Sequence, residues 1–285
     1  MISVILPTYN RAGKIMLSIE SVLSQEFKEF ELIIVDDASV DDTYDIVNKI
    51  SDKRVVYIRH KENKGASVAR NTGWRNSKYE YLAFIDSDDV WDSKYLLSQI
   101  EKYKYTDEGV GLIYCRYINV YKNKKIIKPE NIKIKSNSSI MEAIVVNPFI
   151  TPQIILVRKS VMASLNGFDE NLKSLEDFDF SLRLLQKYKI IRNDDILVEI
   201  RLSNDSLSLQ HEKNIVSSKQ IYNKNVSLFD DIRLKRKYIY SVLRDYYKNT
   251  KKIDMYFVSE LRKSGNMNMY ILKFYLYCLY IRFFE

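Results

Sequence analysis

Four short groups of polar residues in this sequence could carry chemistry, and three of them contain adjacent carboxylates. Aromatic and hydroxyl side chains can stack on a nucleobase and bond to its edge. Carboxylates can accept hydrogen bonds from a base or a ribose, bind a cation, or take a proton in catalysis. The groups are Pro7-Thr8-Tyr9-Asn10, Asp36-Asp37, Asp86-Ser87-Asp88-Asp89 and Glu176-Asp177.

The acidic group Asp86-Ser87-Asp88-Asp89 directly follows the apolar run at residues 81–85. Three carboxylates in four residues repel one another unless a cation is present, and oxygen-only ligands suit Mg²⁺ or Mn²⁺. Magnesium usually takes one or two carboxylates and completes its shell with substrate phosphates. The alternative is a solvated loop that caps the next helix. The apolar run before it favours the metal site of a nucleotide-diphosphate enzyme.

Each of the other three groups has an ordinary structural explanation when taken alone. Pro7 to Asn10 suits a strand-to-helix turn, and Asp37 can help to begin the next helix. Glu176-Asp177 complements the dipole of a helix that begins there. The functional alternatives are base stacking by Tyr9, hydrogen bonding of a base or ribose by Asp37, and general-base catalysis at Glu176-Asp177.

The elements that must position these groups follow from hydrophobic periodicity. Apolar runs predict strands at residues 2–6, 32–35, 55–58, 81–85, 110–121, 154–157 and 196–202. Helical spacing predicts helices at residues 14–23, 42–50, 67–76, 138–146 and 176–188, with a turn at 122–125. Repeated β-α-β units predict an α/β fold with a mostly parallel sheet and helices on both faces. Ligands of such sheets bind outside the carboxyl ends of the strands, where the first three groups fall.

Composition limits the class of protein. Hydrophobic residues make up 46% of the 285-residue chain and charged residues 29%, which is typical of a globular protein. Cys115 and Cys278 are far apart, which indicates a reducing compartment and no disulfide framework. With two Cys and two His, a clustered zinc site is excluded. No secretory leader is visible, so we expect a cytoplasmic protein.

The positive charge is confined to the end of the chain. Residues 206–285 hold 15 Lys and Arg against 7 Asp and Glu, which accounts for the whole net charge of +8, and they carry ten Tyr and five Phe. We therefore predict a main domain at 1–210, divided into halves at 1–105 and 106–210 where the β-α-β rhythm changes, and a helical, basic extension at 211–285. The apolar segment 267–284 is interrupted by Lys273 and Arg282, so no membrane-spanning helix is expected.

The basic extension predicts an acidic partner. Its basic residues cluster at 233–237 and 248–252. They could attract an anionic membrane or a pyrophosphate-linked acceptor, or simply form a solvated helix face. Nucleic acid is excluded as a partner because no motif for it is present. Lys273 and Arg282 fall on opposite sides of a helix, so the last segment is expected to pack in a helical cluster or a subunit interface of a homo-oligomer.

The order of these groups is more specific than any one of them. Over about residues 2–205 the chain resembles the inverting family 2 glycosyltransferases of the GT-A fold. The resemblance rests on VILPTYN (4–10), SVLSQ (21–25), ELIIVDDAS (31–39), NKGASVARN (63–71), FIDSDD (84–89), GFDE (167–170) and EDFD (176–179). It implies metal-assisted transfer of a sugar from a nucleotide-sugar, most often a UDP-sugar, to a hydroxyl of a lipid-linked or protein-linked glycan acceptor. It also implies that residues 1–210 are the catalytic domain, with the nucleotide-sugar-binding half at 1–105 and the acceptor-side half at 106–210.

The resemblance also implies a role for individual residues. Donor binding falls to Pro7, Thr8, Tyr9, Asn10, Asp37, Arg70, Asp86 and Ser87; metal binding to Asp88 and Asp89; and catalysis to Asp177 as the base with Glu176 beside it. Relatives often supply a metal-binding His near the last strand, where this chain has Ser203. His211 is the nearest candidate, and His60 is expected to be packed or solvated.

Two other functions compete with glycosyl transfer. A nucleotidyltransferase could use the same sheet and carboxylates, but residues 10–14 are only a faint phosphate loop and Glu176-Asp177 would have no role. A non-catalytic protein could keep the fold and bind a partner through its basic extension. The intact Asp86, Asp88 and Asp177 argue against it. For a glycosyltransferase we expect action in the cytoplasm or peripherally at the inner face of the plasma membrane.

Overall fold

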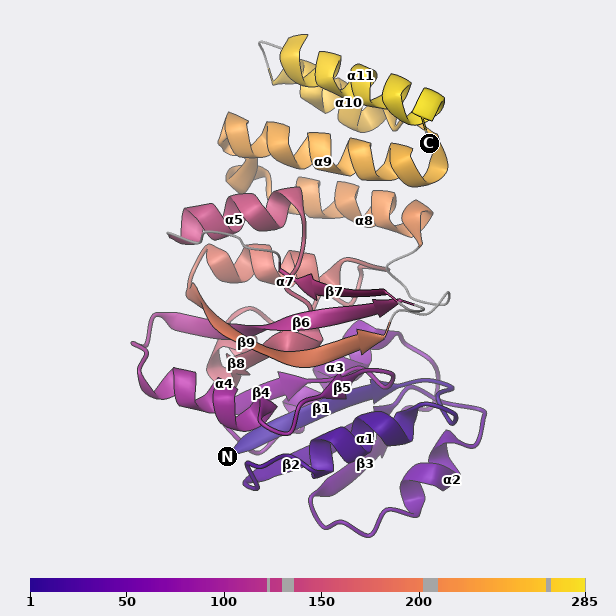
Figure 1. Cartoon of the computed structure of the whole chain (residues 1–285), viewed down its shortest axis with the longest axis vertical. Helices are drawn as coiled ribbons and strands as arrows, with labels where there is room; N and C mark the ends of the chain where they lie inside the picture. The colour runs from indigo at the N-terminus through magenta and orange to yellow at the C-terminus, as the bar shows by residue number, and fades with distance from the viewer. Residues whose placement is uncertain (122–123, 130–135, 202–209, 265–267, 285) are drawn as a thin grey trace. The chain divides into compact units, whose positions relative to one another are not determined.

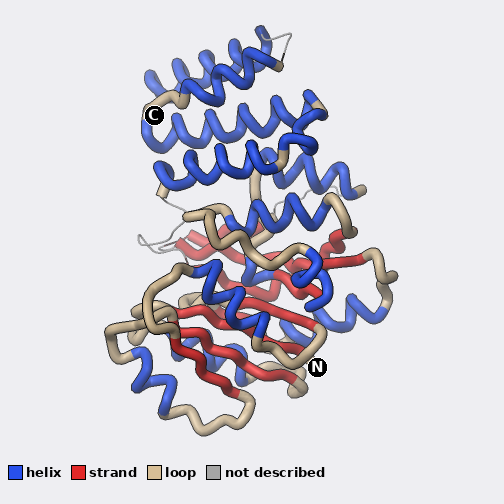
Figure 2. The backbone as a smooth tube through the Cα atoms, turned by 180° about the vertical axis from the view of Figure 1, so that it is seen from behind, coloured by secondary structure: helices blue, strands red, loops and turns tan. Residues whose placement is uncertain are grey.

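The computed structural model describes residues 1–121, 124–129, 136–201, 210–264 and 268–284. The chain forms two compact units (Figures 1 and 2). Unit 1 consists of Met1–Lys133, Phe149–Asn171 and Glu176–Ser203, and unit 2 of Ile134–Pro148, Leu172–Leu175 and Asn204–Glu285. The functional division at residue 210 stays a prediction.

The centre of unit 1 is a mixed sheet that has nine strands within the described residues, in the order β3-β2-β1-β4-β8-β6-β9-β5 with β7 beside β6. Strands β1 to β4, β6 and β9 run in one direction, and β8 runs against its neighbours β4 and β6. The bounds are β1 (Ile2–Thr8), β2 (Phe30–Asp36), β3 (Val55–Arg59), β4 (Tyr81–Phe84), β5 (Val90–Trp91), β6 (Val110–Tyr121), β7 (Lys124–Lys128), β8 (Ile155–Arg158) and β9 (Lys189–Arg201). The predicted α/β class with a mostly parallel sheet is confirmed.

Helices connect the strands of unit 1. They are α1 (Ile15–Leu23), α2 (Thr43–Asn48), α3 (Ala66–Arg75), α4 (Tyr95–Lys104), α6 (Lys159–Ser164) and α7 (Glu176–Leu185), with a 3₁₀ turn η1 (Pro152–Ile154) before β8. The predicted strands and helices of the first 85 residues agree with these bounds to within two residues. Buried apolar side chains on β1, β2 and β4 form the core between the layers.

Two predictions for the second half of unit 1 were wrong. The final strand was expected at 196–202, but β9 begins at Lys189 because its first residues pair with β6 from Val110 onward. Residues 124–125 were expected in a turn, but they belong to β7, which pairs with the end of β6. Residues 122–123 and 202 lie outside the described residues.

Helix α3 packs closely on the sheet at one position. A Cβ built on Gly73 would meet Ile5 Cγ2 at 2.4 Å, so only glycine lets the helix approach β1 this far. Ile5 is fully buried, and it pairs with Ile33 of β2 and Phe84 of β4. This close contact sets the orientation of α3 on the sheet, and thereby the positions of Arg70 and Asn71.

Unit 2 is helical, as predicted for the extension. It contains α5 (Asn137–Val146), α8 (His211–Lys224), a 3₁₀ turn η3 (Val226–Asp230), α9 (Ile232–Thr250), α10 (Met255–Lys263) and α11 (Asn268–Phe284). Helix α9 lies in the middle and contacts the other four helices of the unit, and α11 is its outermost layer on the side away from α8 (Figures 1 and 2). A cluster of stacked and edge-to-face rings joins α8, η3, α9 and α10: Tyr222, Phe229, Tyr238 and Phe257.

Two of the basic residues of α9 form ion pairs within unit 2. Lys235 lies 3.2 Å from Glu260 and Lys237 lies 2.6 Å from Glu142. The expected basic patch at residues 233–237 is therefore partly neutralised by the fold. In the described part of the chain, no helix is both long and apolar enough to cross a bilayer.

Candidate active site

The polar groups gather at one edge of the sheet because of the strand register. In the parallel pair β1–β2, Thr8 lies opposite Asp36, and in β1–β4, Ile5 lies opposite Phe84. The residues that follow these strands therefore leave the sheet at the same carboxyl edge. Strand β8 begins at this edge because it runs antiparallel to β4, with Leu156 opposite Ala83.

The Asp37 carboxylate organises the loop that leads into α3. It is buried and accepts hydrogen bonds from the backbone N–H of Lys64 at 3.0 Å and of Gly65 at 2.7 Å. The ring of His60 lies 2.7 Å from the same carboxylate and 2.9 Å from Thr72 Oγ1, so this His is packed, one of the two states expected. Gly65 has φ +94°, a conformation that favours glycine. The role of Asp37 in donor binding stays a proposal.

The end of β1 offers one exposed ring and one buried hydroxyl. Tyr9 is 43% exposed, whereas Pro7 and Thr8 are buried. Asn10 has φ +50°, and its side-chain oxygen accepts a hydrogen bond from Val40 N at 2.8 Å, which joins this turn to the one after β2. The exposed Tyr9 ring is thus available for stacking, as its predicted role requires.

The acidic loop after β4 holds its carboxylates in different environments. Asp89 is buried and accepts a hydrogen bond from Arg201 N at 2.9 Å. Burial, then the charge of Asp86, raises the pKa of Asp89 well above its ordinary value. The same two causes raise the pKa of Asp88, and the cations of Arg11 and Lys14 oppose the rise. The loop therefore carries more negative charge than its surroundings balance.

Arg70 joins the acidic loop to the beginning of α7. Its guanidinium donates to Asp86 Oδ1 at 2.8 Å and to Glu176 Oε1 at 2.7 Å, and it lies 5.7 Å from the ring centroid of Phe168. The Arg70 side chain is 5% exposed. Burial opposes its charge, but the two carboxylates raise the pKa of Arg70 overall. The structure thus brings together three of the predicted site residues from distant parts of the chain.

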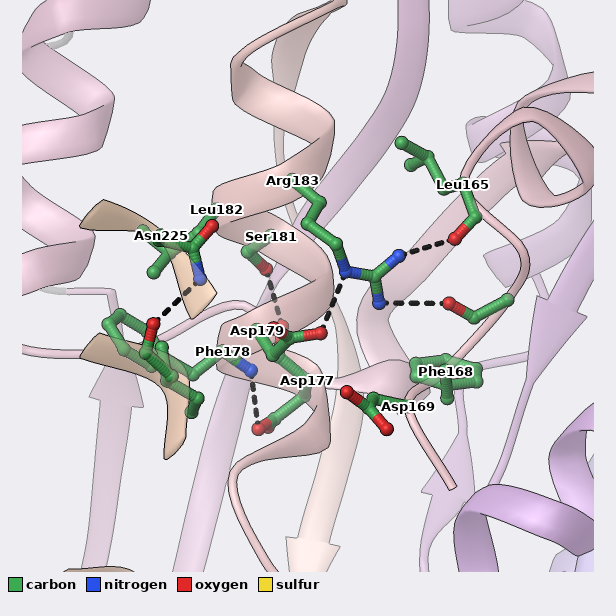
Figure 3. A network of polar contacts seen from close by, with 12 residues as sticks. Leu165, Phe168, Asp169, Asp177, Phe178, Asp179, Ser181, Leu182, Arg183 and Asn225 are labelled. Carbon is green, nitrogen blue, oxygen red and sulfur yellow. Dashed lines mark hydrogen bonds and ion pairs between the residues drawn. The ribbon is translucent and has the colours of Figure 1, made fainter. Parts of the chain in front are cut away.

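Asp177 has the electrostatics of a general base. Burial, then the adjacent charge of Glu176, raises the pKa of Asp177 to about 7, although Phe178 N donates to its Oδ1 at 2.7 Å (Figure 3). The charge of Asp177 in turn helps burial to raise the pKa of Tyr117 on β6, so the phenol lies near it. A carboxylate whose pKa is close to neutral can take a proton at physiological pH.

The position of α7 is fixed by Arg183, a residue that sequence reasoning missed. Its guanidinium pairs with Asp179 at 2.7 Å and donates to Leu165 O at 2.6 Å and Gly167 O at 2.9 Å (Figure 3). Gly167 has φ +66°, and a Cβ there would lie 2.3 Å from Asn71 Oδ1. The sequence offered one sign of this ion pair. Asp179 and Arg183 are four residues apart, and side chains at this spacing meet on the surface of a helix.

The same loop is tied to α3 by Asn71. Its side chain accepts from Phe168 N at 3.0 Å and donates to Phe168 O at 2.8 Å and Glu170 at 2.8 Å. The motif at residues 167–170, which the sequence offered without a stated role, is therefore a brace between α3 and α7. It places Arg70 and Glu176 within reach of each other.

Gln153 is a second residue that sequence reasoning missed. It lies in η1, and its Nε2 donates a short hydrogen bond to Asp86 Oδ2, while Trp91 Nε1 donates to its backbone oxygen at 2.9 Å. Gln153 is 8% exposed, and in the described part of the chain its Oε1 has no hydrogen-bond partner. Thr8 Oγ1 and Arg70 Nε are likewise buried and have no hydrogen-bond partner among the described residues. Such buried polar atoms are suited to a polar ligand.

Comparison with known proteins identifies the family. The sequence profile described as Glycosyl transferase family 2 matches residues 3–165, more than half of the chain. The chain belongs to this family. The resemblance drawn from the motifs is thereby confirmed.

Several relatives of this family 2 chain are glycosyltransferases of bacteria. UDP-Glc:alpha-D-GlcNAc-diphosphoundecaprenol beta-1,3-glucosyltransferase WfaP of Escherichia coli is 39% identical over 127 residues, which cover 45% of this chain and 49% of WfaP. WfgD, an E. coli enzyme with the same description, is 32% identical over 164 residues, 53% of this chain and 64% of WfgD. An uncharacterized glycosyltransferase of Rickettsia felis is 32% identical over 71% of this chain and 33% of its own length. The chain thus spans about half the length of WfaP and a third of the Rickettsia protein.

Solved structures share the fold of this chain. S. aureus TarS 1–349 in complex with UDP-GlcNAc matches with a TM-score of 0.63 and 19% identity, over 98% of this chain and 90% of that one. Mannosyltransferase PcManGT from Pyrobaculum calidifontis, in complex with GDP-Man and Mn²⁺, matches with a TM-score of 0.63 and 16% identity, over 99% and 85%. At these identities the likeness shows the fold, and the predicted GT-A fold is confirmed.

The acidic loop of this family 2 chain fits a divalent cation. Among the described residues, no three His, Cys, Asp or Glu side chains lie together in a metal-binding group. One or two carboxylates are the number that Mg²⁺ commonly takes when phosphates complete its shell, and the acidic loop holds Asp86, Asp88 and Asp89. Burial, then the charge of Asp86, raises the pKa of Asp88, so a bound cation would stabilise the charged form of this carboxylate. Asp86 and Asp89 already accept hydrogen bonds, which makes Asp88 the better-placed ligand.

The role of a histidine at this site stays a prediction. His211 is the first residue of α8 in unit 2, and Ser203 lies outside the described residues. The carboxylates of the acidic loop belong to unit 1.

Proposed function

We propose that this family 2 chain transfers a sugar, with inversion, from a UDP-sugar to a hydroxyl of a diphosphate-lipid-linked GlcNAc acceptor. UDP-glucose is the proposed donor and a β-1,3 bond the proposed linkage. The names of WfaP and WfgD support this donor and acceptor. The proposed place of action is the cytoplasmic face of the membrane, where a lipid-linked acceptor would be found.

The proposal rests on one observation. The buried cation Arg70 links the acidic loop to Glu176, the residue beside the proposed base Asp177. Arg70 bonds both Asp86 and Glu176, and Glu176 adjoins Asp177. Inversion needs one displacement, and hence one base and no covalent intermediate. The site offers a carboxylate with a pKa of about 7 for that purpose. A nucleotidyltransferase would leave this second carboxylate pair without a function.

The chain's own residues then divide the work. Tyr9 stacks on the base of the nucleotide, and Asp86 accepts from a hydroxyl of the ribose or sugar. Asp177 takes the proton of the acceptor hydroxyl as its oxygen attacks C1 of the sugar and the bond to the diphosphate breaks. Burial, then the adjacent charge of Glu176, raises the pKa of Asp177, which makes its carboxylate a stronger base for this step.

The leaving diphosphate needs positive charge near the acidic loop. Asp88 would hold Mg²⁺ or Mn²⁺, which supplies Lewis-acid stabilisation of the leaving phosphates when bound. Arg11 and Lys14, just before α1, are close enough to Asp88 for their charges to oppose the rise in its pKa. We assign them to the phosphates as well. This extends the donor-binding set beyond the residues predicted from sequence.

A transfer assay tests the proposal. The enzyme is incubated with a synthetic GlcNAc-diphosphate-lipid acceptor, Mn²⁺, and one of UDP-glucose, UDP-GlcNAc or GDP-mannose. We expect a product from UDP-glucose whose new bond is β-1,3 by nuclear magnetic resonance. Transfer from GDP-mannose alone would overturn the donor assignment, and an α-linked product from a UDP-sugar would overturn inversion.

The variant Arg70→Lys tests whether the link from Asp86 through Arg70 to Glu176 is needed for activity. Lysine keeps a positive charge but cannot bond two carboxylates through a planar fork. We expect turnover to fall by at least about tenfold while circular dichroism stays unchanged. Arg75→Lys is the control, because Arg75 lies on the same helix and bonds exposed Glu170 at 3.1 Å. Equal activity of all three proteins would refute the role of Arg70.

A further inference from the structure

Helix α11 carries a continuous exposed apolar face. Between 42% and 61% of each member's surface is exposed, and the members are Met269, Leu272, Tyr275, Leu276, Leu279 and Tyr280. At 100° per residue they fill an arc about 140° wide. Phe274, Cys278 and Ile281 lie on the opposite side of the helix and are buried. An exposed apolar face of this size marks an interaction site.

A cation borders this apolar arc on each side. Lys273 falls about 20° beyond Tyr280, and Arg282 falls about 20° beyond Tyr275. Both cations are exposed, and α11 contains no Asp or Glu. An apolar face with a cation at each edge and Tyr at its margins is the pattern of a helix that lies in a membrane interface.

We propose that α11 docks this face on an anionic lipid surface. The helix would lie parallel to the surface, with Leu272, Leu276 and Leu279 in the acyl boundary and Lys273 and Arg282 at the phosphates of the headgroups. The proposal rests on the helix itself and is independent of the assigned donor. It adds a membrane-binding surface to the proposed action on a lipid-linked acceptor.

A second copy of the chain fits this face less well. Met269, Leu272, Leu276 and Leu279 have the 3-4-3 spacing of a coiled-coil seam, which would put Lys273 and Arg282 at the flanking e and g positions. Pairing of two copies through this seam would offer Lys273 and Arg282 no counter-charge from the partner helix, because α11 has no Asp or Glu. Anionic headgroups supply the opposite charge at both edges.

The pairing of other cations in unit 2 strengthens this choice. Lys235, Lys237 and Lys252 each form an ion pair with a glutamate of the unit. Within the described part of the chain, neither Lys273 nor Arg282 forms an ion pair, and Lys273 lies 5.9 Å from the ring centroid of Tyr270. The cations of α11 thus remain available to an outside anion.

Sedimentation with vesicles tests the proposal on the full chain. Vesicles of phosphatidylcholine, with and without phosphatidylglycerol, are compared at low and high salt. We expect binding to the anionic vesicles, weakened about fivefold by each of Lys273→Gln and Arg282→Gln. Leu272→Gln and Leu276→Gln should weaken it by about tenfold each. High salt should remove the contribution of the two cations and leave that of the leucines.

The matched control is Val216→Gln with Val226→Gln, which removes two exposed apolar side chains from α8 and η3. We expect this variant to bind vesicles as the wild type does. Unchanged binding by Leu272→Gln/Leu276→Gln, or equal binding to neutral and anionic vesicles, would overturn the proposal. So would a fall in solution mass of that variant together with unchanged vesicle binding, because it would show that a second copy covers the face.

Sugar transfer to a detergent-dispersed acceptor is measured on the same proteins. Equal transfer by the wild type and Leu272→Gln/Leu276→Gln, together with lost vesicle binding, supports a docking surface separate from catalysis. A wild type that transfers no sugar but binds anionic vesicles through α11 would contradict the proposed function and support this inference.

Discussion

Replacing Asp177 by Asn should inactivate the enzyme and, at the same time, stabilise the folded protein. The amide keeps the shape of the carboxyl group, and its oxygen can still accept from Phe178 N. It cannot take the proton of the acceptor. A positioned base contributes about 10² to 10⁴ in rate, so we expect turnover to fall by at least about a hundredfold.

The gain in stability follows from the raised pKa of Asp177. In the unfolded chain this carboxyl releases its proton near 3.8, and in the folded protein near 7. Between these values the folded state binds more protons, so the free energy of unfolding falls as the pH rises from about 4 to about 7. At 1.36 kcal/mol per pH unit, the full loss has a ceiling of about 4 kcal/mol, of which about 2–3 kcal/mol falls between pH 5 and pH 8.

Urea unfolding at pH 5 and pH 8 measures this difference. We expect the advantage of Asp177→Asn over the wild type to grow by up to about 2–3 kcal/mol between the two pH values. Asp52→Asn is the control, because the pKa of Asp52 is lowered in the folded protein, whereas that of Asp177 is raised. Hydrogen bonds from Arg54 lower the pKa of Asp52 to about 2, so the wild type keeps this contribution throughout the range. The control should lose a small, constant stability of about 1 kcal/mol or less.

Either of two results would refute this reasoning. A gain that is the same at pH 5 and pH 8 would mean that no proton is taken up by Asp177 on folding in this range. Turnover near the wild-type level would mean that the base is another group, such as Glu176 or a group of the substrate. The wild-type rate should itself rise with pH, with an inflection near 7.

Three further changes test the rest of the site. Asp88→Asn should weaken the Mn²⁺-dependent part of UDP binding by at least about tenfold in calorimetry and leave metal-free binding unchanged, because it removes the proposed ligand; equal loss with and without Mn²⁺ would contradict this. Gln153→Glu should weaken UDP binding more than Gln153→Leu does, because it adds a negative charge beside Asp86; the reverse order in the same assay would contradict an effect of charge at this position on UDP binding. Gly167→Ala should lower the free energy of unfolding by about 2 kcal/mol or more, because it combines positive φ with a 2.3 Å clash, whereas Gly13→Ala, which has open space around it, should change the urea midpoint little.

The carboxyl edge of the parallel strands could be predicted from sequence for a physical reason. Buried strands read as apolar runs, and side chains after such runs must meet at one edge when the strands are parallel. Tyr9, Asp37 and Asp86 were placed correctly in this way. The contact of Gln153 with Asp86 could not be predicted, because it depends on β8 running antiparallel to β4. The apolar residues 154–157 predict a strand, but they do not indicate its direction or which strand it pairs with.

The extension shows a second limit of sequence reasoning. Periodicity correctly put Lys273 and Arg282 on opposite sides of a helix, but it did not say which arc between them is buried. The fold buries the arc that contains Phe274, and the opposite arc becomes an exposed apolar face between two cations. Charge counting had a similar limit, because Lys237 lies in a basic cluster of the sequence but pairs with Glu142 in the structure.

Arg70 explains why groups separated by more than a hundred residues belong to one site. A buried guanidinium is stable only when carboxylates compensate its charge, and here Asp86 and Glu176 share that task. The two carboxylates come from the end of β4 and the beginning of α7. Removing either one leaves a buried cation half-compensated, and removing Arg70 leaves carboxylates that would raise the pKa of their neighbours further. The acidic loop and the base are therefore linked through Arg70, which bonds Asp86 and Glu176 and whose charge opposes the rise in the pKa of Asp177.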